Sequence, residues 1–238
     1  MVNNVLEFLK HRKQLPLSID KNTPITEVRY VAIDTELTGL NERKDSIISI
    51  GAVRMTGTKI ELGNTFHQLV KPQSKFKPDS VVIHGITPSD VLEKPNIDSI
   101  LTDFLTFCCS DALIGHCIAI DLSFINKDMK RVFGNPVSNP VIDTYNVYEW
   151  LKMKVPAGSF FSSPLKDISL YEIAKCFDIP VRGAHDALAD AFIAAQLMQR
   201  FMPALIIARI EYIGDLLVIG HPSEGGDKFK ASTGIANF

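Results

Sequence analysis

The sequence predicts an α/β protein in which helices flank a mixed sheet. Three apolar, β-branched runs follow one another at short intervals near the start, with turn residues between them, as in an antiparallel meander. Strand-like and helical segments then alternate, which is typical of sheets with helices packed on their faces. The chain has 238 residues, of which 46% are hydrophobic and 22% are charged. This is enough to bury the core of one such domain.

The elements are expected in the following order. Residues 3–13 place apolar side chains on one helical face, and residues 14–26, which contain two prolines, are expected to be a linker. Strands are expected at residues 28–35, 47–55, 60–70, 112–115 and 141–143, with a loop over 71–88. Helices are expected at residues 97–107, 122–133, 144–152 and 168–177. A last helical stretch, 187–213, is expected to be interrupted at Pro203.

These elements divide the chain into three parts. Residues 1–27 are expected to form an N-terminal helix and linker, residues 28–203 the main domain, and residues 204–238 a C-terminal extension and loosely ordered tail. The longest apolar runs are too short to span a bilayer. The first residues lack the ordered regions of a signal peptide. We therefore expect a cytoplasmic protein without a membrane partner.

Charge and cysteine content argue against two classes of protein: those that coat nucleic acid and those that bind zinc through cysteines. The formal net charge is −2, from 25 basic and 27 acidic residues. Proteins that coat nucleic acid through phosphate contacts are usually basic, so any nucleic acid must be held locally. The four cysteines form no CxxC pair, which argues against a zinc site and favours reduced thiols.

Four acidic residues and one histidine are the candidates for chemistry. Asp34 and Glu36 alternate along the first strand, so their carboxylates share one face; alone, the pair is a weak signal. Asp121 follows a Gly–His turn at the start of a helix, where an aspartate often serves only as an N-cap. Asp190 lies inside an alanine-rich helix, where a buried carboxylate needs a partner or a metal. His185 stands just before that helix.

Taken together and in this order, the motifs resemble those of the DEDD exonuclease superfamily, in its histidine-bearing branch. The pattern is most similar to the epsilon proofreading subunits of bacterial replicative DNA polymerases. The matching residues are Asp34-Thr35-Glu36 with Thr38-Gly39-Leu40, then Gly115-His116 with Asp121, Phe124 and Ile125, then His185 and Asp190. The segments IHGIT and LYEIAKCFDIP also match, and the resemblance covers residues 28–202. It implies a ribonuclease H-like fold with a five-stranded mixed sheet.

The resemblance also implies an activity and a cofactor. The expected reaction is metal-dependent 3′→5′ hydrolysis of nucleic acid, releasing nucleoside monophosphates. Two divalent ions about 4 Å apart activate the attacking water and stabilise the leaving oxygen in such sites, and oxygen ligands favour Mg²⁺ or Mn²⁺. The implied metal ligands are Asp34, Glu36, Asp121 and Asp190. The implied general base is His185, since an imidazole exchanges protons near neutral pH.

The implied substrate contacts are Thr35, Leu37, Thr38, His84 and Phe124. His84 is explained equally well as a structural turn residue. Leu37 occupies a place that is often threonine in the family, which leaves sugar or base preference open. Asp186 is better explained as a helix N-terminal charge than as a catalytic group.

Substrate and partners stay open at this level. Single-stranded DNA is the expected substrate, with an RNA exonuclease similar to oligoribonuclease or ribonuclease T as the alternative. A non-catalytic nucleic-acid-binding or polymerase-scaffolding protein is the alternative of another class. A DNA polymerase is a candidate partner by the resemblance to epsilon subunits, and a sliding clamp is another, because residues 14–17 (QLPL) faintly resemble clamp-docking motifs. Basic side chains that either hold phosphates or are merely solvated are Lys71, Lys75, Lys77, Lys127, Lys130 and Arg131.

Overall fold

A five-stranded mixed sheet forms the centre of the molecule. The computed structural model describes residues 19–154 and 169–222. The expected helix at 3–13, the tetrapeptide 14–17 and the tail beyond residue 222 lie outside these residues. The strands have the order β3-β2-β1-β4-β5, with β1–β2 and β2–β3 antiparallel and β1–β4 and β4–β5 parallel. Their bounds are β1 Arg29–Leu37, β2 Ile47–Thr56, β3 Lys59–Leu69, β4 Ala112–Gly115 and β5 Val141–Asp143. The mixed five-stranded sheet predicted from the sequence is confirmed.

The described helices agree with the sequence pattern except for three short ones that were not expected (residues 78–84, 88–91 and 213–219) and one expected interruption that is absent. They are α2 Pro78–His84, α3 Pro88–Val91, α4 Ile97–Cys108, α5 Ala119–Phe133, α6 Thr144–Lys154, α7 Leu170–Cys176, α8 Ala187–Ile207 and α9 Ile213–Ile219. The stretch 71–88, expected to be a loop, contains α2, which begins at Pro78 and ends at the left-handed Gly85. Pro203 does not interrupt α8, which continues to Ile207. None of the helices in the described part of the chain is long and apolar enough to cross a membrane.

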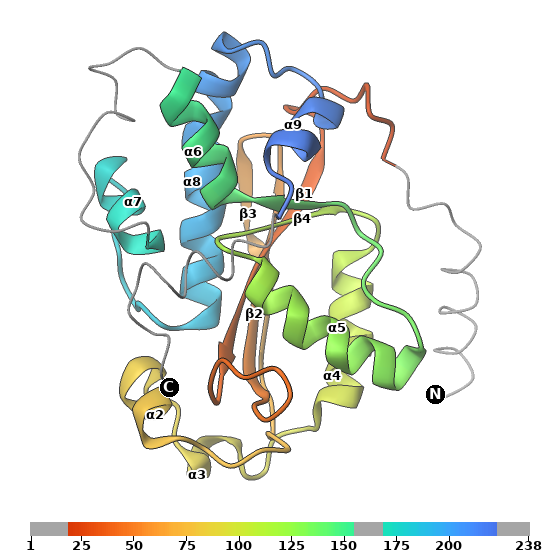
Figure 1. The fold of residues 1–238 in the computed structure, drawn as a ribbon, viewed down its shortest axis with the longest axis vertical. Coiled ribbons are helices and arrows are strands. Elements are labelled where there is room, and N and C mark those ends of the chain that lie inside the picture. Colours follow the sequence, from red (N-terminus) through yellow and green to blue (C-terminus); the bar gives the residue numbers. More distant parts are fainter. Residues whose placement is uncertain (1–18, 155–168, 223–238) are drawn as a thin grey trace.

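The side chains of β1 alternate between two apolar layers. Tyr30 and Ala32 belong to the core formed with α6, α7, α8 and α9, whereas Val31 and Ile33 belong to the core formed with α4 and α5. Figure 1 shows α6, α7 and α8 on one side of the sheet and α4 and α5 on the other. Because successive strand residues point to opposite faces, even-numbered residues of β1 point towards the first of these cores and odd-numbered residues towards the second.

Packing extends beyond the expected boundaries of the main domain. Helix α8 crosses residue 203, and Leu205, Ile213 and Leu216 are fully buried in the same core as β1. This packing holds Pro203 in the helix, because burial of its neighbours outweighs the hydrogen bond that a proline cannot make. A bridge between Pro24 and Tyr212 joins the segment before β1 to the segment before α9.

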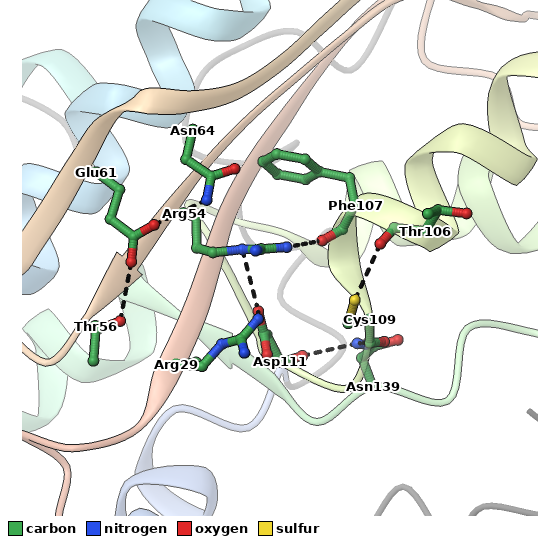
Figure 2. Close-up of polar contacts among 10 residues, drawn as sticks. All are labelled: Arg29, Arg54, Thr56, Glu61, Asn64, Thr106, Phe107, Cys109, Asp111 and Asn139. Carbon is green, nitrogen blue, oxygen red and sulfur yellow. Dashed lines mark hydrogen bonds and ion pairs between the residues drawn. The ribbon is translucent and has the colours of Figure 1, made fainter.

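An ion cluster around the buried Asp111 closes one end of the sheet (Figure 2). The carboxylate of Asp111 lies 3.0 Å from Nη2 of Arg29 and 3.4 Å from Nε of Arg54. Arg54 also donates to the carbonyl of Phe107 and lies over its ring, 5.0 Å from the centroid. Asn139 donates to the carbonyls of Cys109 and Asp111. The cluster fixes the starts of β1 and β4 and the end of β2, and the candidate chemistry lies at the opposite end of the sheet.

Candidate active site

Three carboxylates converge where β1 ends beneath the start of α8. Asp34 and Glu36 point to the same face as Tyr30 and Ala32, which is the face that α8 covers. Asp190 lies in the first turn of α8. One ligand oxygen from each of Asp34, Glu36 and Asp190 lies within 4.8 Å of the other two. Oxygen atoms grouped in this way form a candidate site for a hard divalent cation.

The close approach of α8 depends on a glycine in β2. Gly51 is the cross-strand partner of Asp34. A Cβ atom on Gly51 would lie 2.2 Å from backbone atoms of Ala187 and Leu188, the first residues of α8. The helix therefore rests directly on the backbone of β2, which brings Asp190 over Asp34.

Asp190 has one satisfied oxygen and one free oxygen. Its Oδ2 accepts hydrogen bonds from the Tyr171 hydroxyl at 2.5 Å and from the His185 amide at 3.2 Å. Its Oδ1 is buried without a hydrogen-bond partner among the described residues. A buried carboxylate oxygen without a partner carries a large desolvation cost. A bound cation would remove this cost, so the residues present fit a metal.

Asp121 approaches the same place from the other face of the sheet. It lies in the first turn of α5, whose N-cap is Ile118, so Asp121 does not cap the helix. Its Oδ1 accepts hydrogen bonds from the amide of Thr35 at 2.9 Å and from the Thr35 hydroxyl at 2.6 Å. Asp121 is not one of the three residues grouped within 4.8 Å, but its negative charge raises the pKa of both Asp34 and Glu36.

The carboxylates oppose one another's ionisation. Burial raises the pKa of Asp34 well above its usual range, and the charges of Asp121, Glu36 and Asp190 raise it further, although part of the side chain is exposed. Burial and the charges of Asp190 and Asp121 raise the pKa of Glu36 to about 9. Burial raises the pKa of Asp121 to about 7, against the lowering effect of the Thr35 hydrogen bonds. The cluster therefore ionises fully only when a positive charge compensates it.

His185 stands beside this cluster in a strained turn. Its φ is +62°, a left-handed conformation that is uncommon for a residue with a side chain. Its amide donates to the Tyr171 hydroxyl at 2.8 Å and to Oδ2 of Asp190. Its ring meets the Tyr171 ring edge-on, with centroids 5.1 Å apart. The turn is held by the same carboxylate that contributes the free oxygen, so His185 and Asp190 are positioned together.

His84 lies at the end of α2 and interacts electrostatically with His185. Burial lowers its pKa, and the charge of His185 lowers it further. Its Nδ1 accepts a hydrogen bond from the amide of Ile86 at 3.0 Å, which is the structural role in the turn that the sequence allowed. Its Nε2 is buried without a partner among the described residues. His84 is thus near enough to His185 for the two imidazoles to influence each other's charge.

Comparison with known proteins identifies the family. Residues 31–198 match the family model described as Exonuclease (RNase_T). The chain belongs to this exonuclease family. It is 32% identical to the DNA polymerase III subunit epsilon of Aquifex aeolicus, over 81% of this chain and 90% of that protein. The resemblance to DEDD exonucleases that the motifs predict is confirmed.

Solved exonuclease structures share the fold. The structure of E. coli Exonuclease I in complex with a dT13 oligonucleotide has a TM-score of 0.68 and 18% identity, over 77% of this chain and 43% of that one. Exonuclease X in complex with 5′ overhanging duplex DNA has a TM-score of 0.58 and 22% identity, over 81% and 99%. The predicted ribonuclease H-like fold is therefore confirmed. The chain spans less than half of the Exonuclease I chain.

The exonuclease buries most of the residues expected to contact substrate. The Thr35 side chain points away from the three grouped carboxylates and bonds Asp121. Thr38 is fully buried, where its hydroxyl bonds Ser74 and accepts from the amide of Ser46. Leu37 and Phe124 are 8% and 1% exposed, within the core against α4 and α5. Thr35 therefore holds Asp121, whereas Thr38, Leu37 and Phe124 pack within the protein, and substrate contact by these four residues stays a prediction.

Several charged residues near the exonuclease site have partners within the protein. Lys77 pairs with Asp45 at 2.9 Å. Lys127 donates to backbone carbonyls of the same loop at 2.8 and 3.0 Å. Asp186 is the N-cap of α8 and accepts from the amide of Ala189 at 2.9 Å, so the interpretation as a helix N-terminal charge is confirmed.

Two residues at the site were not found from the sequence. Tyr171 lies in LYEIAKCFDIP, a segment that resembles the family as a whole but contains no residue whose role the resemblance implies. His67, on β3, has its Nε2 4.0 Å from a carboxylate oxygen of Asp186 and 3.2 Å from the hydroxyl of Ser49. Neither contact follows from local spacing, because the partners are more than ten residues away in the chain.

Proposed function

We propose that this exonuclease removes nucleoside monophosphates one at a time from the 3′ end of DNA, using two divalent metal ions and a histidine base. The observation that carries the proposal is the convergence of Asp34, Glu36 and Asp190, with Oδ1 of Asp190 buried and unpaired within residues 19–154 and 169–222. The similarity to a subunit of DNA polymerase III supports DNA as the substrate. It also suggests a DNA polymerase as the partner.

The donor set suits Mg²⁺ or Mn²⁺, because it consists of carboxylate oxygens without thiolate or imidazole ligands. Asp34, Glu36 and Asp190 would hold one ion among them, and Asp121, from the opposite face of β1, would help to hold a second. When bound, the ions supply the positive charge that makes a water molecule acidic and stabilises the leaving 3′-oxygen. The carboxylates in turn would fix the positions of the ions relative to His185, the proposed general base.

His185 would take the proton as water oxygen forms its bond to phosphorus. The bond between phosphorus and the 3′-oxygen of the preceding nucleotide then breaks, which leaves a nucleoside 5′-monophosphate and a shortened chain. His185 lies in the turn before α8 and is partly exposed, while its backbone is tied to Asp190. A base placed in this way contributes about 10²–10⁴-fold to the rate.

The rim formed by α2 would meet the terminal nucleotide. Val82 and Ile83 are 85% and 47% exposed and directly precede His84, whose pKa is lowered by the charge of His185. Exposed apolar side chains beside a polar site can pack against a base, which has apolar faces. We therefore keep substrate contact as a proposal for His84 and its neighbours on α2.

The test follows 5′-labelled DNA and RNA single strands of one sequence, with Mg²⁺, Mn²⁺ or EDTA. The variants are His185→Ala and Asp34→Ala, and the control is Asp103→Ala, an exposed aspartate on α4. We expect a metal-dependent ladder that shortens from the 3′ end, with kcat lower by about 10²–10⁴-fold in His185→Ala and unchanged in the control. If RNA is shortened faster than DNA, the proposed substrate is RNA and not DNA. No shortening of either polymer would favour the scaffolding function.

A further inference from the structure

Tyr171 connects the candidate metal ligand to the candidate base. It lies in the first turn of α7, a helix capped by the Ser169 side chain. The Tyr171 hydroxyl donates its proton to Oδ2 of Asp190 at 2.5 Å, and its oxygen accepts the amide proton of His185 at 2.8 Å. One hydroxyl group thus completes two contacts, and each ends on a residue to which we assign chemistry.

The first contact decides which oxygen of Asp190 is free. A carboxylate can turn about its Cβ–Cγ bond and present either oxygen, or both, to a cation. With Oδ2 held by Tyr171 and by the His185 amide, Oδ1 is the oxygen left without a partner in the part of the chain that the structure describes. Hydrogen bonds to a carboxylate are among the stronger ones in proteins, so this contact fixes the rotation of the group.

The second contact stabilises the strained turn at His185. A φ of +62° is strained for a residue with a side chain and persists only where the surrounding structure holds it. The amide of His185 finds two acceptors, the Tyr171 hydroxyl and Oδ2 of Asp190. The Tyr171 ring also packs edge-on against the His185 ring. Loss of the hydroxyl removes the shorter of the two amide hydrogen bonds while leaving the ring contact in place.

We propose that Tyr171 is a positioning residue that orients Asp190 for the metal and holds the His185 turn. This inference rests on the proposed function, because it assigns Asp190 to the metal and His185 to proton transfer. Residues that hold metal ligands through hydrogen bonds typically contribute about 10–100-fold in metal affinity or activity. A hydroxyl that only stabilised the fold would change neither quantity in the folded protein.

The chain offers a matched control at the far end of the same sheet. Tyr30 is fully buried on β1, and its hydroxyl donates to the carbonyl of Ile25 at 2.8 Å. Tyr30→Phe and Tyr171→Phe each remove one hydroxyl that makes a protein hydrogen bond and leave the ring in place. The variants therefore differ in location, while the chemical change is the same.

The experiment compares wild type, Tyr171→Phe and Tyr30→Phe in three measurements: the melting temperature in EDTA, the dissociation constant for Mn²⁺ by titration calorimetry, and kcat and KM on a DNA single strand. We expect both variants to melt below wild type, because each loses a hydrogen bond. Tyr171→Phe alone should bind Mn²⁺ about 10–100-fold more weakly and lose kcat by a similar factor, with KM for DNA unchanged. Raising the Mn²⁺ concentration should restore part of the lost kcat.

The outcomes separate this inference from the proposed function. Wild-type Mn²⁺ affinity and kcat in Tyr171→Phe, with an active wild-type protein, would overturn the positioning role and leave the proposed function standing. An equal loss of Mn²⁺ affinity in Tyr30→Phe would also overturn it, because the effect would then be one of general stability. A wild-type protein that neither binds Mn²⁺ nor shortens DNA would overturn both. The calorimetry is run below the melting temperature of each variant, so reduced stability alone does not obscure the result.

Discussion

Adding a single methyl group at Gly51 should greatly reduce activity, although Gly51 is not one of the candidate metal ligands. In Gly51→Ala the new Cβ would stand 2.2 Å from backbone atoms of Ala187 and Leu188, whereas ordinary contact begins at about 3.4 Å. Because these neighbours are backbone atoms, no side chain can rotate away. The start of α8 must therefore retreat from β2 by about 1.2 Å and would carry Asp190 and the His185 turn with it.

The expected loss is larger in activity than in stability. Overpacking a core typically costs about 1–3 kcal/mol, whereas misplacing catalytic groups by about 1 Å can cost about 100-fold in rate. We would measure kcat on a labelled DNA strand, together with melting temperatures in EDTA and in Mn²⁺. The matched control is Gly63→Ala on β3, where the added Cβ meets no atom within 4 Å.

We expect kcat of Gly51→Ala to fall by about 100-fold, with a smaller Mn²⁺-induced rise in melting temperature than in wild type. Gly63→Ala should behave as wild type in both measurements. A folded Gly51→Ala protein with wild-type kcat and a wild-type Mn²⁺ response would refute the reasoning. It would show that the contact between α8 and β2 does not determine the position of Asp190.

Two further predictions concern pH and the far end of the sheet. In EDTA, the folded protein retains protons on Glu36 (pKa about 9) and Asp121 (pKa about 7) that the unfolded chain releases near pH 4. Their contribution to stability is therefore complete below about pH 4 and is lost as the pH rises towards about 9. The melting temperature in EDTA should fall over this range and Mn²⁺ should raise it most at high pH; a rise with pH in EDTA would contradict this. Asp111→Asn should lower the free energy of unfolding by about 1–3 kcal/mol, because Arg54 loses its buried counter-charge, with kcat on DNA unchanged; a loss of kcat in the stably folded variant would be evidence against it.

Local patterns were sufficient to predict most of the sheet and helices. The strands alternate between two buried layers or are short apolar runs, and the larger helices carry apolar residues at helical spacing. Each of these elements can therefore be predicted from the residues of its own segment. Helix α2 was missed because its apolar residues Val81, Val82 and Ile83 are consecutive and two of them are exposed, which gives no amphipathic period. The expected break at Pro203 was wrong because tertiary burial of Phe201 and Met202 holds the helix together.

The candidate ligands could be predicted from the order of the motifs, whereas their support could not. Asp34 and Glu36 share a face by strand periodicity alone, and Asp190 was marked by its apolar surroundings. The partner of Tyr171 is 19 residues away in the chain and that of Thr35 is 86 residues away. Contacts over such separations are set by how α7 and α5 pack on the sheet, which the sequence pattern does not specify.

The alternation of β1 explains why one strand can serve both sides of the site. Asp34 and Glu36 point towards α8, while Thr35 points towards α5 and holds Asp121. A slip of one residue between β1 and β2 would exchange the two faces and separate the carboxylates from Asp190. The observed register pairs Asp34 with Gly51, and Gly51 is also where α8 meets the sheet. Gly51 therefore links the register of β1 to the position of α8. It lets the start of α8 pack closely on β2, and it is also the cross-strand neighbour of Asp34, the carboxylate that Asp190 of α8 approaches.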